Sequence, residues 1–250
     1  MPDRTVGADT AYPVTEDLIV AATRVLGAPP LFWGRYFTSQ QSRGNVEYRH
    51  RLEDAVLAAH GIRVLPIARQ TDDVGGSFGD GQREGMANAS DVIATFGESY
   101  LVDQGGQFFI FLDVEGSGRS RLSADYYAGW VEGLAQASKN VDFLPCVYGL
   151  PGDAVTWTAL ARALAHGTAC SGLWMSHPLL KRPEPVAWDN ATVAPSPDPG
   201  APILLWQYMF PRDGANIDRS VVNPAIDAQD DFLAFLIPPP AAPPEAQPNS

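Results

Sequence analysis

Helix-like and strand-like segments alternate along this chain, and that alternation constrains its fold more than any other feature. Apolar residues recur at helical spacing (i, i+3, i+4, i+7) in several segments, among them 18–25 and 127–134. Strand-like runs rich in β-branched and aromatic residues lie between them, at 5–9, 31–37, 62–68, 107–115, 143–150, 171–177, 202–210 and 215–218. Strands and helices in this order are typical of βαβ units with a parallel sheet. Eight strands predict the α/β class and an irregular TIM-type (β/α)8 barrel.

The chain length and its proline-rich stretches predict the domain organisation. The 250 residues suit one barrel, which we expect over residues 1–236. Residues 178–200 are rich in proline and lack helical spacing, so a loop is expected to replace one of the later helices. Residues 237–250 read "IPPPAAPPEAQPNS", a composition that predicts a disordered tail.

The formal net charge of −12 argues against nucleic acids and anionic membrane surfaces as partners, because both attract basic proteins. No run of about 18 apolar residues is present, so insertion into a membrane is not expected. The opening "MPDRTVGADT" lacks the apolar centre of a signal peptide. We therefore expect the chain to reach the cell envelope by another route or to stay in the cytoplasm.

Few other motifs point to chemistry. The two cysteines, Cys146 and Cys170, cannot alone complete a zinc site, and neither a metal nor an organic cofactor is expected. The glycine-rich run 75–81 lacks the residues of a phosphate-binding loop and is expected to be a flexible connection. Trp130 and Trp157 lie on apolar helical stripes and are expected in the core.

The run "FFIFLDVEGS" ends in two carboxylates, Asp113 and Glu115. Side chains two residues apart in a strand share a face, so both acids are expected to point inward with Phe109 and Phe111. Barrel enzymes build their active sites at this end of the strands. Two carboxyls there, one protonated in apolar surroundings and one ionised, suit cleavage of a glycosidic bond, and we expect Glu115 to be partly shielded from water so that it holds the proton. The alternative is that the acids only cap helices or pair with nearby arginines.

Other acids follow predicted strands. Asp9 follows the first strand, Asp72 and Asp73 follow the third, and Asp218 ends the last. Acids that end several strands of one barrel converge on one mouth. Unpaired carboxylates repel one another, so such clusters usually bind a cation or perform acid/base chemistry.

Six motifs in order, over residues 5–225, carry a resemblance to a known family. They are "VGADTAYP", "WGRYF", "QFFIFLDVEG", "CVYG", "LWMSH" and "LLWQYMFPRDGANIDRSVVN". The set resembles glycoside hydrolase family 25, the lysozyme-type muramidases. It is more similar still to the related glycoside hydrolase-like domain of actinobacterial exported proteins.

The resemblance implies roles for the acids. Glu115 matches the general acid, and Asp113 matches the carboxylate that steadies an intermediate formed by the substrate's own N-acetyl group. Asp9 and Asp218 match supporting carboxylates around the reacting sugar. The substrate-binding side chains expected near strand ends are Tyr36, Asp72, Tyr148, His177, Trp206, Gln207 and Tyr208.

The resemblance therefore implies a glycosidase that acts on β-1,4-linked N-acetylated glycans such as peptidoglycan. One alternative is a glycan-binding barrel with little or no turnover. A weaker alternative uses the acids as Mg²⁺ or Ca²⁺ ligands in a phosphodiesterase-like barrel.

Overall fold

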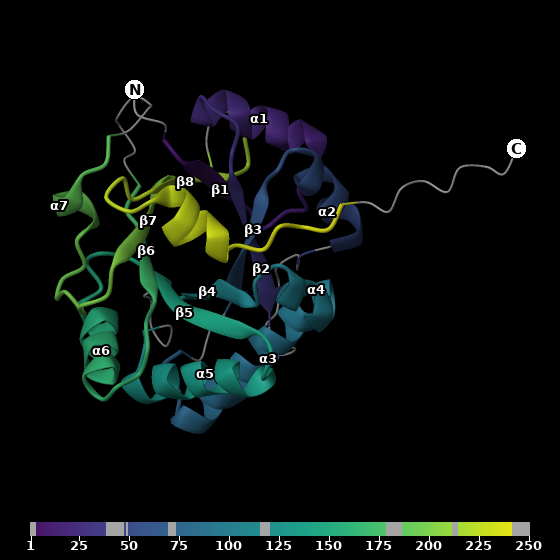
Figure 1. Cartoon of the computed structure of the whole chain (residues 1–250). Coiled ribbons are helices and arrows are strands. Elements are labelled where there is room, and N and C mark those ends of the chain that lie inside the picture. The colour runs from purple at the N-terminus through teal and green to yellow at the C-terminus, as the bar shows by residue number, and fades with distance from the viewer. Residues whose placement is uncertain are drawn as a thin grey trace, which may run out of the picture.

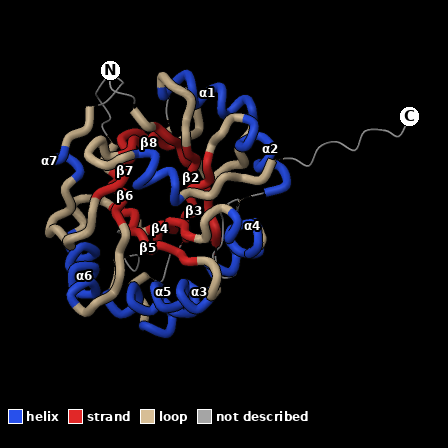
Figure 2. Tube along the Cα trace, in the orientation of Figure 1, coloured by secondary structure: helices blue, strands red, loops and turns tan. Residues whose placement is uncertain are grey.

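The computed structural model describes residues 4–38, 48, 50–69, 74–115, 121–178, 187–211 and 215–241. Their strands form one closed barrel in which each strand pairs with the next and β8 returns to β1 (Figures 1 and 2). The strands are β1 (Val6–Asp9), β2 (Phe32–Thr38), β3 (Arg63–Arg69), β4 (Gln107–Asp113), β5 (Asp142–Gly149), β6 (Gly172–Ser176), β7 (Ile203–Met209) and β8 (Asp218–Val222). The predicted α/β barrel is confirmed.

Helices cover the outside of the barrel, most fully in its first two thirds. They are α1 (Glu16–Leu26), α2 (His50–Ala59), α3 (Phe78–Phe96), α4 (Glu98–Asp103), α5 (Ala124–Ala137), α6 (Ala154–Ala165) and α7 (Asn190–Val193). Between β6 and β7 only the short α7 is found in the described residues, and between β7 and β8 none, as expected for later helices replaced by loops. Within the described parts, no helix is long and apolar enough to cross a membrane.

The last strand departs from the prediction in position and in direction. It begins at Asp218 rather than ending there, and it runs antiparallel to both β7 and β1. The β-branched pair Val221 and Val222 lies within it, which suits a strand better than the turn-forming residues before Asp218. Asp218 still lies at the end of the barrel where β1 finishes, because it is the first residue of a strand that runs in the opposite direction.

Local signals fix several helix ends. The Thr15 side chain accepts a hydrogen bond from the Leu18 backbone N–H and starts α1, while Gly27 ends it in a left-handed conformation (φ 74°). Ser77 and Asp80 form a capping box at the start of α3. The glycine-rich run 75–81 is therefore not simply a flexible connection, because its second half is the first turn of α3.

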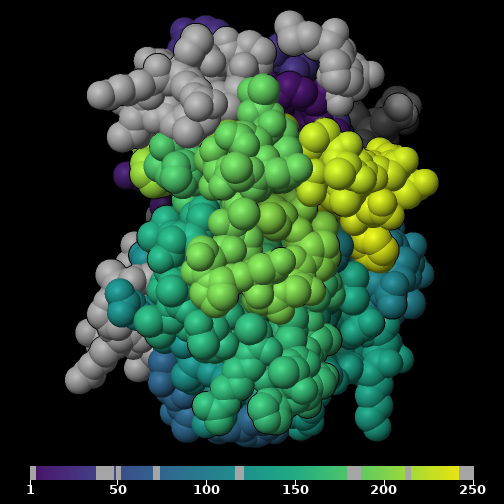
Figure 3. All heavy atoms as spheres, turned by 90° about the vertical axis from the view of Figure 1, so that its left-hand side faces the viewer, coloured from purple at the N-terminus to yellow at the C-terminus, as the bar shows by residue number. Residues whose placement is uncertain are grey.

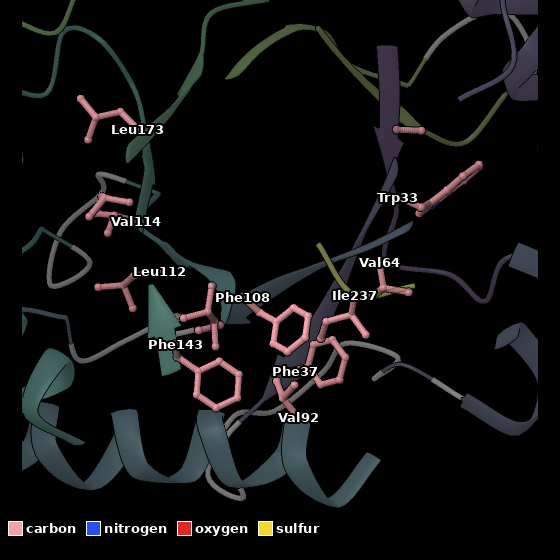
Figure 4. Close-up of a cluster of buried hydrophobic side chains, with 14 of the residues drawn as sticks. Trp33, Phe37, Val64, Val92, Phe108, Leu112, Val114, Phe143, Leu173 and Ile237 are labelled. Atoms are coloured by element: carbon pink, nitrogen blue, oxygen red, sulfur yellow. The ribbon is translucent and has the colours of Figure 1, made fainter. Parts of the chain in front are cut away.

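Apolar side chains alternate between the two faces of each strand. Along β4, Ile110 and Leu112 point outward into the layer under the helices, part of which Figure 4 shows, whereas Phe109 and Phe111 fill the interior. Both faces are apolar because the strands are covered by helices outside and by one another inside. The helical tryptophans Trp130 and Trp157 are fully buried in the outer layer, which confirms their predicted core position.

The C-terminal segment 228–237 closes the barrel at the end opposite Asp9 and Asp113. The Phe232 ring meets the Phe32 ring edge-on at 5.2 Å, and Arg63 Nη1 donates to the Leu233 carbonyl at 2.7 Å. Figure 3 shows this segment in yellow beside the green surface formed by the later strands and loops. Ile237 is fully buried and bridges to Val64, so the packed chain passes the predicted boundary at residue 236. Residues 242–250 of the predicted tail lie outside the described residues.

Helices α3 and α5 pack backbone against backbone through glycines spaced four residues apart. A Cβ placed on Gly81 or Gly85 of α3 would overlap the Tyr126 or Trp130 carbonyl oxygen of α5, respectively. Gly129 on α5 faces α3 in the same way. Because glycine has no side chain, the backbones of the two helices are in direct contact at these positions.

We expect Gly85→Ala to destabilise the fold by about 1–3 kcal/mol, because the added methyl group forces the helices apart. Gly79→Ala is the matched control in the same helix, since the nearest atom to its added Cβ lies 4.0 Å away. The control should leave stability unchanged or raise it slightly, because alanine favours helix formation. Urea unfolding of both variants measures the difference, and equal effects would contradict the tight contact.

Candidate active site at the barrel mouth

Each of the eight strands contributes one inward-facing polar side chain to the same end of the barrel, which we call the mouth ring. Interior positions alternate along each strand, so the ring follows directly above the apolar interior formed by residues such as Ile67, Phe111 and Trp174. The register pairs Asp9 with Asp218, Arg69 with Asp113, and Ser176 with Gln207. In strand order the mouth ring is Asp9, Tyr36, Arg69, Asp113, Tyr148, Ser176, Gln207 and Asp218.

Asp9 and Asp218 form a carboxyl pair where the barrel closes; Asp9 is buried and Asp218 is half-buried. Burial and the neighbouring charges of Asp218 and Asp113 raise the pKa of Asp9 well above its usual value. Burial also raises the pKa of Asp218 to about 6, although hydrogen bonds from Gln207 and Asp9 lower it. Of the two carboxyls, Asp9 therefore holds a proton more readily, and it donates a hydrogen bond to the Asp218 carboxylate.

Asp113 is the buried member of the Asp-x-Glu pair. Its side chain is 4% exposed, and burial together with the charge of Glu115 raises its pKa to about 7, while Arg69 acts in the opposite direction. Glu115 lies beyond the end of β4 and is exposed. The expectation that apolar surroundings would shield Glu115 is therefore wrong. The strand ends at Asp113, so the low-polarity environment belongs to that residue.

Tyr36 and Tyr148 lie in the mouth ring as neutral hydrogen-bonding groups. Burial and the charges of Asp9 and Asp113 raise the pKa of Tyr36. Burial followed by the charge of Asp113 also raises the pKa of Tyr148, whose ring meets Trp174 edge-on at 5.1 Å. Both hydroxyls stay protonated at physiological pH and can take part in hydrogen bonds at the mouth. The structure thus brings these two predicted residues to the acids.

Trp206 and Tyr208 do not reach the mouth. Both are fully buried on the outer face of β7, where their rings pack against each other at 6.1 Å, and Trp206 Nε1 donates to the His177 carbonyl at 3.0 Å. The expectation that Trp206 and Tyr208 bind substrate is wrong, because strand alternation points Gln207 inward and its two neighbours outward. His177 is exposed just after β6. Asp72 lies outside the described residues.

Sequence reasoning missed two members of the mouth ring, Arg69 and Ser176. Arg69 shares a face with Leu65 and Ile67, which fill the interior, and Ser176 shares a face with Trp174. Counting in steps of two from these interior residues would have found both.

Several buried polar atoms of the mouth ring lack a partner. Within the described part of the chain, five atoms of the ring are buried without a hydrogen bond: Asp9 Oδ2, Arg69 Nε, Ser176 Oγ, Gln207 Oε1 and Asp218 Oδ1. Buried polar atoms in proteins nearly always have a partner. Five such atoms around one mouth indicate a place where a polar ligand or water completes the hydrogen bonding.

Among the described residues, no group of three or more His, Cys, Asp or Glu side chains is arranged to hold a metal ion. What the described mouth residues offer is acid/base chemistry from carboxyls with separated proton affinities, and hydrogen bonding from two tyrosines and a glutamine.

No protein-family model matches the sequence, and no curated protein matches it. Solved structures do match. An uncharacterized protein of B. stearothermophilus aligns over 92% of this chain and 99% of its own, with a TM-score of 0.66 and 21% identity. The muramidase from Acremonium alcalophilum aligns over 93% of this chain and 99% of its own, with a TM-score of 0.53 and 15% identity. A family 25 glycosyl hydrolase from Bacillus anthracis aligns over 92% of each chain, with a TM-score of 0.50 and 13% identity. The chain therefore has the lysozyme-type barrel fold of glycoside hydrolase family 25, as its motifs predicted.

The raised pKa of Asp113 predicts a stability that depends on pH. The folded chain holds the Asp113 proton more tightly than the unfolded chain. The stabilisation from this proton is therefore complete below the usual pKa of 3.8 and is lost as pH rises through about 7. Because a difference of one in pKa corresponds to about 1.4 kcal/mol, the free energy of unfolding should fall by roughly 4 kcal/mol over this range. Asp113→Asn cannot ionise, so it should match wild type below about pH 3.8 and be increasingly more stable than wild type up to about pH 7 and above.

Urea unfolding of both proteins at several pH values tests this difference. Asp103→Asn, at an exposed position at the end of α4, is the control and should show no such trend. A difference between Asp113→Asn and wild type that stays constant with pH would contradict the buried, proton-holding carboxyl.

Proposed function

We propose that this protein is a glycoside hydrolase that cleaves β-1,4 links beside N-acetylated sugars, as in peptidoglycan. The observation that supports this most is the meeting of two buried carboxyls, Asp9 and Asp113, and the half-buried Asp218 at one mouth, with the exposed Glu115 just beyond the end of β4. Glycoside cleavage needs carboxyls that differ in protonation at the same pH, and this mouth supplies them.

The burial pattern suggests how the acids divide the work. Glu115 is exposed and free to meet a bound glycan, so it donates the proton to the departing glycosidic oxygen. As that bond breaks, the acetamido oxygen of the sugar attacks the anomeric carbon and positive charge develops there. Asp218, ionised above about pH 6, and Asp113 stabilise this charge. Asp9 holds Asp218 in place through their shared proton.

Recognition of the sugar falls to the neutral groups of the mouth ring. The hydroxyls of Tyr36 and Tyr148 and the amide of Gln207 are the donors and acceptors that sugar hydroxyls and acetamido groups require. Because peptidoglycan lies outside the cytoplasmic membrane, the proposal also places the working protein at the cell envelope.

Glu115→Gln tests the proposed acid. It should abolish the release of reducing ends from purified peptidoglycan while leaving glycan binding largely intact, because glutamine keeps the shape but cannot donate a proton. Glu132→Gln, at an exposed position on α5, is the matched control and should retain full activity.

A wild type that binds N-acetylated glycans but releases no reducing ends from any of them would instead support the glycan-binding barrel. Equal rates for Glu115→Gln and wild type would remove Glu115 from the chemistry.

The rate should also depend on pH through Asp113. Burial and the negative charge of Glu115 raise the pKa of Asp113 to about 7, so Asp113 becomes a carboxylate as pH rises through that value. Because an ionised Asp113 stabilises the developing positive charge better than a neutral one, we expect its contribution to kcat/KM on a soluble N-acetylated oligomer to rise through about pH 7. Asp113→Asn should lower kcat and remove this rise. A rise that stays at the same pH in the variant would show that another group controls it.

A further inference from the structure

Arg69 is the cation of the mouth ring, and the residues around it fix its position. It is the last residue of β3, in register with Asp113 on β4. Its guanidinium carbon lies 5.4 Å from the centre of the Tyr36 ring, a distance at which a cation and an aromatic face attract each other. The side chain is half-buried, so the ring and the strand hold the guanidinium at the mouth rather than in bulk water.

The hydrogen bonding of this guanidinium is incomplete. Its Nε is buried and has no acceptor within the described residues, and no described carboxylate lies within ion-pair distance of it. The charge of Arg69 lowers the pKa of Asp113, its partner in register, against the larger effect of burial, but the two side chains do not form an ion pair. Because Asp113 keeps its proton until about pH 7, it is a weak competitor for the guanidinium below that pH.

From this geometry we propose that Arg69 is a specificity-determining residue that binds a carboxylate carried by the glycan. A guanidinium offers parallel N–H donors that match the two oxygens of a carboxylate, and such charge-assisted pairs are stronger than neutral hydrogen bonds. The inference deepens the proposed function and rests on it: the preferred substrate is an acidic N-acetylated glycan rather than a neutral one. The carboxylate can belong to a lactyl ether or to a uronic acid, which the test separates.

Binding of matched ligands to Glu115→Gln protein, which spares the ligand from cleavage, tests the inference. The ligands are an N-acetylglucosamine–N-acetylmuramic acid oligomer with free lactyl carboxylates, the same oligomer with those carboxylates amidated, and a uronate-containing N-acetylated oligomer. Titration calorimetry near pH 5.5, where Asp113 is protonated with or without Arg69, gives the Kd values. The free acid should bind about 10-fold or more tighter than the amide, the range for a charge-assisted hydrogen bond.

Adding Arg69→Gln should collapse this acid-to-amide ratio toward one, and Arg69→Lys should restore part of it, because lysine keeps the charge but not the paired donors. The ratio is the readout, so a general loss of affinity in a variant does not imitate the result. Melting curves confirm that each variant folds. Tight binding of the uronate oligomer with no preference for the lactyl acid would assign the subsite to uronates.

The failures can be told apart. Equal affinity for free acid, amide and uronate would overturn the role of Arg69 while leaving the proposed function standing. An acid preference that survives Arg69→Gln would do the same. No binding of any N-acetylated oligomer would overturn both.

Discussion

The pairing of β8 with β1 is the constraint on which the mouth depends. Because β8 runs antiparallel to its neighbours, its first residue, Asp218, lies opposite the last residue of β1, Asp9. Closing the barrel therefore brings the buried Asp9 and the half-buried Asp218 together, and two negative charges at such proximity repel strongly. A shared proton relieves this repulsion: Asp9 holds it and hydrogen-bonds through it to Asp218. Besides burial, the charges of both residues also raise the pKa of the ring tyrosines, Tyr36 and Tyr148.

A mouth of buried, partly unpaired polar groups costs stability, and the rest of the barrel offsets it. The interior below the ring is apolar and closed at the far end by Phe232 and Leu233. On the outer face, Arg35 and Glu53 form a fully buried ion pair with two short contacts, Nε–Oε2 at 2.7 Å and Nη2–Oε1 at 3.0 Å. Arg35 also donates to the Thr10 carbonyl at 2.8 Å, and Glu53 accepts the Val14 backbone N–H. This network fixes the segment that leaves β1 directly after Asp9, so it holds the site in shape from outside. Natural active sites commonly trade stability for such preorganisation.

Much of this architecture could be predicted from the sequence, and the misses share physical causes. Helical spacing at 18–25 and 127–134 predicted α1 and α5, and the structure starts these helices with the local caps Thr15 and Ser123. Strand alternation correctly predicts that Asp113 points into the barrel. The same rule applied to β6 and β7 predicts Ser176 and Gln207 at the mouth and excludes the predicted His177, Trp206 and Tyr208. The direction of β8 depends on partners distant in sequence, so no local pattern encodes it. The exposure of Glu115 likewise depends on where β4 loses its neighbours, which the apolar run before it does not reveal. Arg69 was overlooked because a terminal arginine in a strand usually points to solvent.

On the proposed function, the charge of the mouth ring matters more than that of the whole chain for the glycans that can enter. The chain carries a formal net charge of −12, which by itself disfavours an anionic polymer. Within the ring, however, the raised pKa of Asp9 favours its neutral form, Asp113 is largely neutral below about pH 7, and Arg69 opposes the charge of Asp218. Surface charges separated from a ligand by more than a Debye length of about 8 Å are screened at physiological ionic strength, whereas the buried groups of the ring are screened much less. The protons that relieve repulsion among the ring carboxyls therefore also lower the negative charge that the proposed acidic glycan would meet.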